Sequence, residues 1–338
     1  MISLTKGAFT VVEKEGVKVA EVKKSDDVAL ECTLQDLTVE QPATLEKVLA
    51  KLEKYGGCIV KNYLPLETVD RILADVEEYI DQDKDFEGTF LPRQTRTVPG
   101  MCKKSAVTTE EFVCHPLNLA VSDALLGKEN CFWIGDEVVT GYSAPQHNSC
   151  ITFKIGPGAP DQVLHRDDML HHNIRKHMDV YEYGTETALG SVLALSNTSK
   201  ANGATRFVPG SHLWSHMRKP TASEAVYAEM SKGDCFFMLA SCYHGGSANT
   251  TEDEYRTQVI LFMTQGILRQ EENIMVGTPV EYFKSLSVTA LKTLGLSLSY
   301  PFLGMVDGYD GLRTFKPEHY EKRKNDDPYT SVYPGVLV

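Results

Sequence analysis

The 338 residues carry a net charge of −12 and are 42% hydrophobic, a globular composition whose acidity argues against nucleic acid or an anionic membrane as the main partner. No apolar run approaches the roughly 20 residues of a membrane-spanning helix, and residues 1–6 lack the pattern of a signal peptide. The eight cysteines form no C-x-x-C pair, so we expect reduced thiols and a cytoplasmic protein.

The chain begins with a predicted arm and then a helical layer. Residues 1–40 mix short β-type runs with charge and are expected to form the N-terminal arm. Thr44 is placed to cap a helix over 45–55, because the apolar residues that follow share one helical face. The glycines at 56 and 57 end this helix, and a short strand over 58–61 follows.

A second amphipathic helix is predicted from Pro65 to about residue 82. Residues 83–105 contain several basic side chains and are expected to form a loop. His115 precedes a proline, so we expect it to cap the helix that ends near Leu126-Gly127 rather than to act as a metal ligand.

From about residue 132 the pattern changes to short β-type runs separated by clusters of Gly, Pro, Asn and Ser. This spacing predicts a jelly roll or sandwich, hence a mainly β fold with a helical layer (α+β). We expect one domain, made of an arm and helical layer (1–130), a β core (131–270), and a C-terminal helix with a lid segment (271–338). The predicted strands cover residues 137–142, 149–155, 190–195, 205–208, 234–239 and 257–264.

One short segment concentrates side chains that bind metals. His165 and Asp167 stand two apart in an apolar-flanked stretch, and on a strand such residues point to the same face. Asp168 would then point to the opposite face. One further histidine would complete a set of two histidines and one carboxylate, which suits non-haem Fe(II) with open coordination positions.

Several histidines are candidates for the third ligand. Those at 171, 172 and 177 are too close in sequence to close a site across a barrel, and His212 more readily holds a turn. His244 is better placed, because the two glycines after it allow the backbone to pass close to a metal site. Arg256 then opens an apolar strand, where a buried arginine requires a carboxylate partner.

Together these residues resemble a known family. The order His165-x-Asp167, His244, Arg256 is similar to that of Fe(II)/2-oxoglutarate-dependent dioxygenases. The segments from Asn202 to His212 and from His244 to Asn249 narrow the resemblance, which spans roughly 45–265, to the phytanoyl-CoA dioxygenase family and its fungal secondary-metabolite branch. The resemblance implies a double-stranded β-helix (jelly roll, cupin-like) with N-terminal helices packed on it, often as a homodimer.

The same resemblance assigns roles to individual residues. His165, Asp167 and His244 would hold iron and so form the catalytic centre. Arg256 would bind the distal carboxylate of the co-substrate 2-oxoglutarate. Three further co-substrate contacts would come from Gln162, Thr205 and, on a looser alignment, Arg96.

Such an enzyme uses O2 and 2-oxoglutarate to oxidise a C–H bond, and it releases succinate and CO2. The outcome is hydroxylation, desaturation, rearrangement or endoperoxidation. We expect a small apolar natural product, meroterpenoid-like, as the substrate, in a pocket that excludes water. Segments 83–105 and 173–188 and the tail after 317 are candidate lids.

Three alternatives stay open on the sequence. The first is a phytanoyl-CoA-type acyl-CoA hydroxylase, although the acidic charge and the C-terminal Gly-Val-Leu-Val, which is not a peroxisomal address, weigh against it. The second is a non-catalytic metal-binding β-barrel, which would be expected to have lost a ligand. The third is a zinc hydrolase, which has no use for Gln162 and Arg256.

Overall fold

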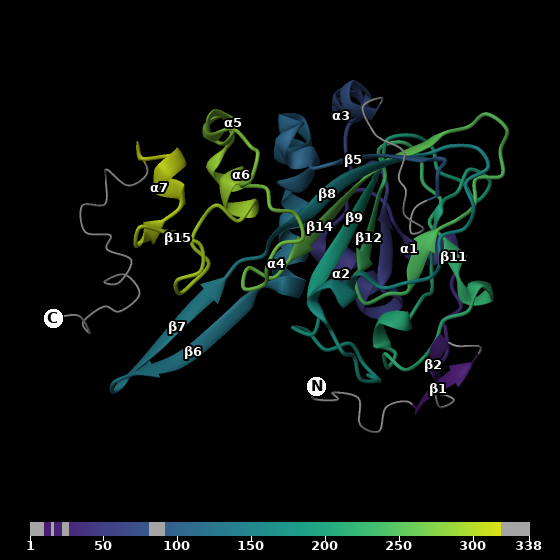
Figure 1. Ribbon diagram of the computed structural model, residues 1–338, viewed down its shortest axis with the longest axis horizontal. Helices are drawn as coiled ribbons and strands as arrows, with labels where there is room; N and C mark the ends of the chain where they lie inside the picture. Colours follow the sequence, from purple (N-terminus) through teal and green to yellow (C-terminus); the bar gives the residue numbers. More distant parts are fainter. Residues whose placement is uncertain (1–9, 15–16, 22–26, 81–91, 319–338) are drawn as a thin grey trace.

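The computed structural model describes residues 10–14, 17–21, 27–80 and 92–318. A large sheet, in the order β3-β4-β12-β9-β14-β8-β5, and a small sheet, β11-β10-β13, make up the centre of the fold (Figure 1). All pairs are antiparallel except β3 with β4. The strands are β3 (Thr38–Val39), β4 (Gly57–Val60), β5 (Thr95–Pro99), β8 (Gln146–Ile155), β9 (Ala188–Ala194), β12 (Cys235–Leu239), β14 (Arg256–Thr264), β10 (Thr205–Phe207), β11 (Val226–Tyr227) and β13 (His244–Gly246).

Helices cover one face of the large sheet, as predicted. They are α2 (Leu45–Tyr55), α3 (Leu66–Ile80) and α4 (Pro116–Leu126), with a 3₁₀ turn η1 (Met101–Lys103) and a π-helical segment η2 (Thr108–Val113) between the last two. The short helix α1 (Leu34–Leu37) instead buries Leu37 with Ile59 and Val192, on the opposite side. The Thr44 side chain accepts from the Lys47 amide, and Gly56 ends α2 in the left-handed region with φ 77°. A Cβ at Gly56 would lie 2.2 Å from Cys242 Sγ, so glycine is required there. His115 caps α4 through its side chain, as predicted.

Alternation along the central strands separates two environments. Leu193 and Val259 face the helical layer and belong to the main core with residues of α2, α3 and α4. Val192 and Ile260 face the opposite way and line a cavity between the two sheets. Because both faces are covered, β9 and β12 are buried along their whole length. The mainly β, jelly-roll core with a helical layer is therefore confirmed.

Other parts differ from the prediction. The expected loop at 83–105 holds strand β5 and η1, while residues 81–91 lie outside the described residues. Of the C-terminal tail only residues up to 318 are described. Further elements lie outside the two central sheets, among them a hairpin that contains the predicted strand 137–142. These elements are the hairpin β6 (Lys128–Ile134) and β7 (Glu137–Ser143), the pair β15 (Met305–Val306) and β16 (Tyr309–Asp310), helices α5 (Val280–Ser285), α6 (Val288–Thr293) and α7 (Leu312–Phe315), and 3₁₀ turns η3 (Asp167–His171), η4 (Ser211–Leu213) and η5 (Ala222–Glu224).

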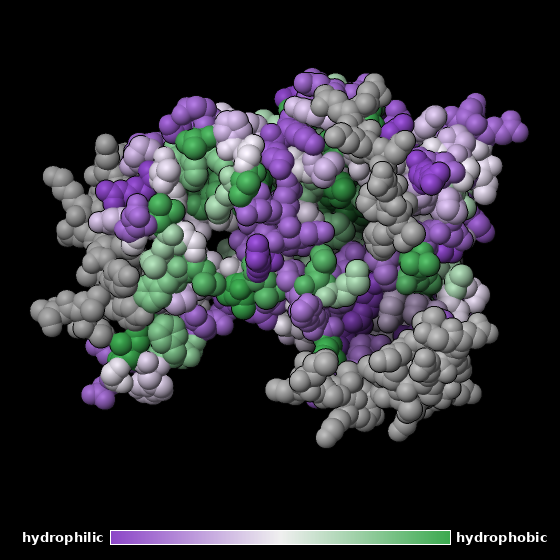
Figure 2. All heavy atoms as spheres, viewed as in Figure 1, coloured by the Kyte–Doolittle hydropathy of each residue, from purple (hydrophilic) through white to green (hydrophobic). Residues whose placement is uncertain are grey.

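The N-terminal β-type runs pair as a hairpin of β1 (Thr10–Lys14) and β2 (Val17–Glu21). The hairpin β6–β7 extends away from the sheets (Figure 1). On the face shown in Figure 2, hydrophobic side chains are scattered among hydrophilic ones. None of the helices within the described ranges is long and apolar enough to cross a membrane.

Candidate metal centre

The backbone brings the two candidate histidines side by side. His165 forms a single antiparallel bridge with His244, in which each amide donates to the other carbonyl at 2.9 Å. The predicted strand through 165–167 is therefore wrong as a regular element, because the chain turns into η3 at Asp167. A Cβ at Gly245 would lie 3.0 Å from the carbonyl oxygen of Gln162, so this glycine permits the close approach.

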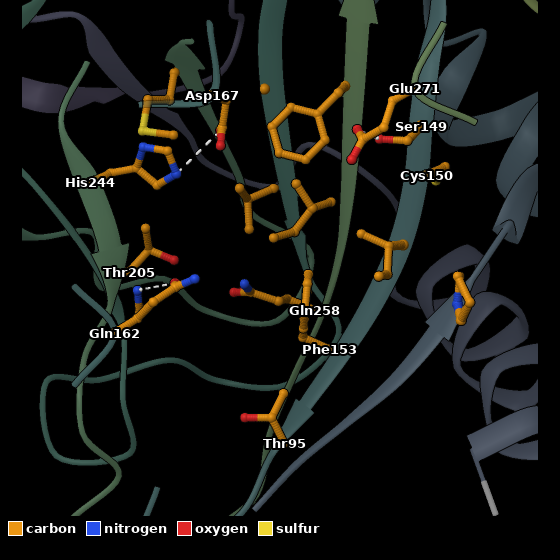
Figure 3. A pocket seen from close by; sticks show the side chains of 18 of the residues that line it. Thr95, Ser149, Cys150, Phe153, Gln162, Asp167, Thr205, His244, Gln258 and Glu271 are labelled. Atoms are coloured by element: carbon orange, nitrogen blue, oxygen red, sulfur yellow. Dashed lines mark hydrogen bonds and ion pairs between the residues drawn. The ribbon is translucent and has the colours of Figure 1, made fainter. Parts of the chain in front are cut away.

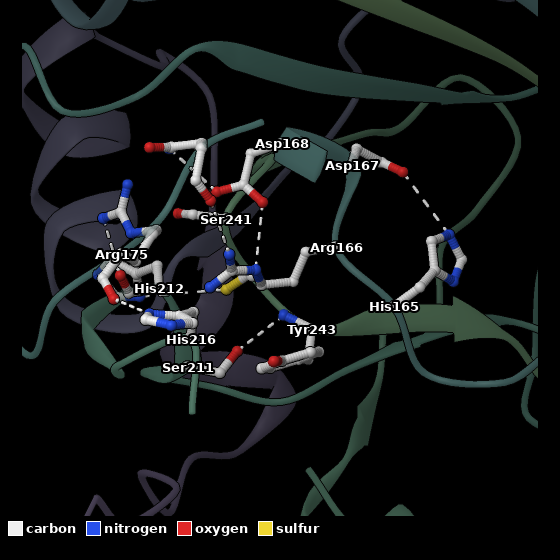
Figure 4. Close-up of polar contacts among 12 residues, drawn as sticks. His165, Arg166, Asp167, Asp168, Arg175, Ser211, His212, His216, Ser241 and Tyr243 are labelled. Atoms are coloured by element: carbon white, nitrogen blue, oxygen red, sulfur yellow. Dashed lines mark hydrogen bonds and ion pairs between the residues drawn. The ribbon is translucent and has the colours of Figure 1, made fainter. Parts of the chain in front are cut away.

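Three potential ligand atoms converge in this place. Those of His165, Asp167 and His244 lie within 4.8 Å of one another. His165 Nε2 is 3.6 Å from Asp167 Oδ1, and His244 Nε2 is 3.2 Å from Asp167 Oδ2 (Figures 3 and 4). The structure thus brings together the three residues that the sequence singled out.

The second nitrogen of each ring fixes which atom faces the centre. His165 Nδ1 lies 2.9 Å from the carbonyl oxygen of Val163, and His244 Nδ1 lies 3.1 Å from that of Cys242. A carbonyl only accepts hydrogen bonds, so each Nδ1 carries the proton and each Nε2 presents a lone pair. Asp167 Oδ2 is buried, and it accepts no hydrogen bond from the residues that the structure describes. Three lone-pair donors therefore face one point, an arrangement that fits a bound cation.

Burial and mutual charge act together on these groups. Burial lowers the pKa of His165, and the neighbouring His244 lowers it further. For Asp167 burial acts to raise the pKa, but the facing His244 and His165 hold the pKa of this carboxyl below its ordinary value. Both shifts favour the deprotonated forms that bind metals. For His244 burial acts to lower the pKa, but the facing Asp167 carboxylate holds it above its ordinary value.

Asp168 points away from the centre, into a separate ionic cluster (Figure 4). Its carboxylate lies 3.1 Å from Arg166 Nε, and its side chain is fully buried. Next to this pair, Arg175 Nη1 lies 3.0 Å from Glu186 Oε1, to which Ser241 also donates at 2.8 Å. We call these five residues the rear cluster. The predicted separation of Asp167 from Asp168 holds, although a turn rather than a strand produces it.

A buried guanidinium, that of Arg256, lines the same cavity as the three potential metal ligands. Arg256, the first residue of β14, is 1% exposed. Its Nη1 donates to Thr205 Oγ1 at 3.3 Å and to Gln258 Oε1 at 3.0 Å, while Nε has no hydrogen-bond partner in the described ranges. Within the described part of the chain no carboxylate lies in ion-pair range, and burial lowers the pKa of Arg256 to about 9. An uncompensated buried cation of this kind requires an anionic ligand.

The remaining predicted co-substrate residues divide. Gln162 is held to Gly246 by two hydrogen bonds: its backbone N–H donates to the Gly246 carbonyl at 2.9 Å, and its side-chain Oε1 accepts from the Gly246 N–H at 3.1 Å. It lines the same cavity as Thr205. Arg96 does not line the cavity. It is exposed on β5, whose alternation turns the neighbouring Thr95 inward instead.

His165, Asp167 and His244, which we call the triad, line one cavity of about 650 Å³. Arg256 lines the same cavity. Of the candidate lids, residues between Pro92 and Lys104 border it, whereas the segment 173–188 contributes only its last residue, Ala188, which already belongs to β9. Sequence reasoning missed Gln258, which the alternation rule would have found because it stands two residues after Arg256. It also missed Ser149 and Glu271, for which the sequence carries no signal. Apolar walls come from Ile151, Phe153, Ile155, Met169, Leu170, Val192, Met238, Ile260 and Phe262.

Comparisons with known proteins define the class. The family model of phytanoyl-CoA dioxygenase (PhyH) matches residues 52–257. The chain is 35% identical over 283 residues to dioxygenase himG of Aspergillus japonicus, covering 80% of this chain and 87% of the relative. It is 36% identical over 266 residues to dioxygenase peniF of Penicillium patulum, covering 78% and 86%. The chain therefore belongs to the phytanoyl-CoA dioxygenase family, and the protein is a dioxygenase.

A solved structure agrees with the fold. The epimerase SnoN, whose structure contains Fe3+, alpha ketoglutarate and nogalamycin RO, superposes with a TM-score of 0.51 at 18% identity and covers 71% of this chain and 93% of SnoN. At this identity the likeness supports the jelly-roll architecture.

Proposed function

We propose that the protein is an Fe(II)- and 2-oxoglutarate-dependent oxygenase that oxidises a C–H bond of a small, mostly apolar natural product. One observation carries the proposal: a two-histidine, one-carboxylate set and an uncompensated buried arginine open into the same cavity. The first is a site for a cation and the second is a site for a carboxylate. 2-Oxoglutarate satisfies both at once, since it has a chelating end and a distal carboxylate.

His165, Asp167 and His244 would hold the iron. Three protein ligands leave coordination positions open, which is the arrangement of non-haem Fe(II) oxygenases. When bound, the iron supplies the oxidising chemistry with O2. The protein's own part is to orient the ligands, which the carbonyls of Val163 and Cys242 do by fixing each imidazole ring with Nε2 toward the centre.

Arg256 would bind the distal carboxylate of 2-oxoglutarate, with Thr205 and Gln162 beside it. Gln258 and Thr205 hold the guanidinium by accepting from Nη1, which leaves its other nitrogens for the ligand. A charge-assisted pair of this kind is stronger than a neutral hydrogen bond. The alpha ketoglutarate in the SnoN structure supports the choice of dicarboxylate.

The apolar walls would position the substrate and exclude water from the reaction. A compact, ring-rich molecule such as a meroterpenoid would suit an apolar cavity of about 650 Å³. The similarity to fungal dioxygenases supports a natural-product substrate. Release of succinate and CO2 would accompany hydroxylation, desaturation, rearrangement or endoperoxidation.

Anaerobic titration tests the proposal directly. Purified protein with Fe(II) should develop a metal-to-ligand charge-transfer band on addition of 2-oxoglutarate, and in air it should release succinate. Zinc in place of iron should give neither signal. Glutarate, which has the distal carboxylate but no keto acid, should compete without producing the band. Absence of both the band and succinate formation from the iron-loaded protein would reject this function.

A further inference from the structure

The cavity has a second polar region, opposite the triad. Figure 3 shows Ser149 and Glu271 across the cavity from Asp167 and His244. The apolar side chains of Ile151, Val192 and Phe262 belong to the wall of the same cavity. A substrate that reaches from the triad across this apolar space meets the Glu271 carboxylate at its far end.

The fold holds Glu271 in place. The register of β8 against β14 shifts between Phe262 and Met263, which leaves Asn148 as an extra residue in a β-bulge. Asn148 Oδ1 accepts from the Glu271 amide at 2.8 Å, and its backbone carbonyl accepts from the Glu272 amide at 2.9 Å. Bulges of this kind re-aim side chains next to active sites. The position of Glu271 is therefore set by the central sheet.

At this end of the cavity Glu271 is an exposed carboxylate, and among the described residues no cation lies beside it. Lys103 lies 3.4 Å from Glu272, and Lys104 donates to the carbonyl of Pro99 at 2.7 Å. Within the described ranges the Glu271 carboxylate has no ion-pair partner, and it takes one hydrogen bond, from the neutral Ser149 hydroxyl at 2.6 Å. A ligand that covers this carboxylate removes water from it, which is costly unless the ligand returns a hydrogen bond.

We propose that Glu271 is a specificity-determining residue that accepts a hydrogen bond from the substrate. The substrate is then a compact apolar skeleton with a hydrogen-bond donor, a hydroxyl or a protonated amine, at the end remote from the oxidised carbon. This inference rests on the proposed function, since it assigns the substrate class of the same cavity. A carboxylate or a plain hydrocarbon at that end is disfavoured.

Three probes of one shape test the assignment: adamantanemethanol, adamantanemethylamine and adamantyl methyl ether. Their affinities are measured by calorimetry on the anaerobic protein with Fe(II) and 2-oxoglutarate. The alcohol or the amine should bind at least about tenfold more tightly than the ether, because only these two donate to the carboxylate. Which of the two binds better distinguishes a hydroxyl substrate from an amine.

Variants locate the preference. Glu271→Gln keeps an acceptor and loses the charge, so amine affinity should fall about tenfold or more while alcohol affinity falls less. Glu271→Leu should abolish the preference for either donor. Glu281→Gln on α5 is the matched control, because Glu281 is 81% exposed and pairs with Lys284, and it should bind all probes as the wild type does.

Equal affinity for the three probes, including no measurable binding of any, would overturn the assignment, as would a donor preference that survives in Glu271→Leu. The affinity for 2-oxoglutarate is measured on the same samples. If that affinity is normal and the donor preference is absent, only the role of Glu271 fails. If 2-oxoglutarate does not bind, the proposed function itself fails.

Discussion

Two ionic clusters stand back to back along four residues of this chain. His165 and Asp167 face the cavity, while Arg166 and Asp168 face the rear cluster (Figure 4). Both clusters are largely buried, so burial does not distinguish them. What distinguishes them is whether their charges are paired. In the rear cluster each carboxylate faces a guanidinium. In the cluster of His165, Asp167 and His244, lone pairs face one another.

The contrast separates a structural cluster from a functional one. Oppositely charged groups that satisfy one another need no ligand and fix the fold around them. Buried lone pairs that face one another with no hydrogen-bond donor between them are costly, and a bound cation removes that cost. The same reasoning applies to Arg256, which is buried with no carboxylate beside it among the described residues, while Arg175 is buried against Glu186. Uncompensated charge, rather than charge itself, marks the proposed site.

The largest effect is expected from replacing Asp167, with the neighbouring Asp168 of the rear cluster as the control. Asp167→Ala should weaken Fe(II) binding by at least about a hundredfold and remove succinate formation, because a direct ligand matters at least as much as its supporting contacts. Asp168→Ala should retain iron binding in the folded protein. Iron titration followed by the 2-oxoglutarate charge-transfer band measures both. The reverse pattern would show that Asp168 is the ligand.

The rear cluster predicts a loss of stability instead. Arg175→Met leaves Glu186 buried without its cation and should cost about 3–5 kcal/mol of unfolding free energy, measured by urea denaturation. Replacing both partners, as Arg175→Met with Glu186→Leu, should recover most of that loss. The affinity of the folded protein for 2-oxoglutarate should stay unchanged in both. If Arg175→Met weakened 2-oxoglutarate binding without destabilising the fold, the division into two clusters would be wrong.

Sequence reasoning succeeded where local rules decide the outcome. Thr44 and Gly56 bound α2 because capping and left-handed backbone depend on neighbouring residues. The opposition of Asp167 and Asp168 followed from alternation, and it survived the replacement of a strand by a turn. The jelly roll followed from the spacing of short β-type runs.

It failed where distant segments meet. Arg96 was assigned by its place in a presumed loop, but pairing of β5 with β8 sets the facing of each residue and turns Arg96 outward. Ser149 and Glu271 meet through a bulge that no local pattern announces. Such contacts depend on register between strands far apart in the sequence.

Arg256→Lys tests the same distinction where the distal carboxylate of 2-oxoglutarate is proposed to bind. A planar guanidinium grips a carboxylate with two parallel hydrogen bonds, which an ammonium group does not reproduce. We expect 2-oxoglutarate binding to weaken by about 2–3 kcal/mol, some 30- to 150-fold, with iron affinity barely changed. Titration of the anaerobic Fe(II) protein measures it. Wild-type affinity in this variant would remove Arg256 from the site.

The smallest effect is expected at Thr205. Its hydroxyl accepts from Arg256 Nη1 at 3.3 Å, a long contact, and the same nitrogen also donates to Gln258 at 3.0 Å. Thr205→Val conserves the shape and removes only this neutral hydrogen bond, worth roughly 1 kcal/mol, so 2-oxoglutarate affinity should fall about tenfold or less.

Thr205→Ser keeps the hydroxyl and serves as the matched control, with near wild-type affinity expected. Compared with each other, Arg256→Lys and Thr205→Val show whether the charge or the neutral hydrogen bond contributes more to 2-oxoglutarate binding. Because the distal carboxylate is an anion in a buried place, its free energy of binding depends first on the cation and only then on neutral neighbours. A Thr205→Val protein that bound 2-oxoglutarate more weakly than Arg256→Lys would reverse that order, and it would make the hydroxyl the principal contact.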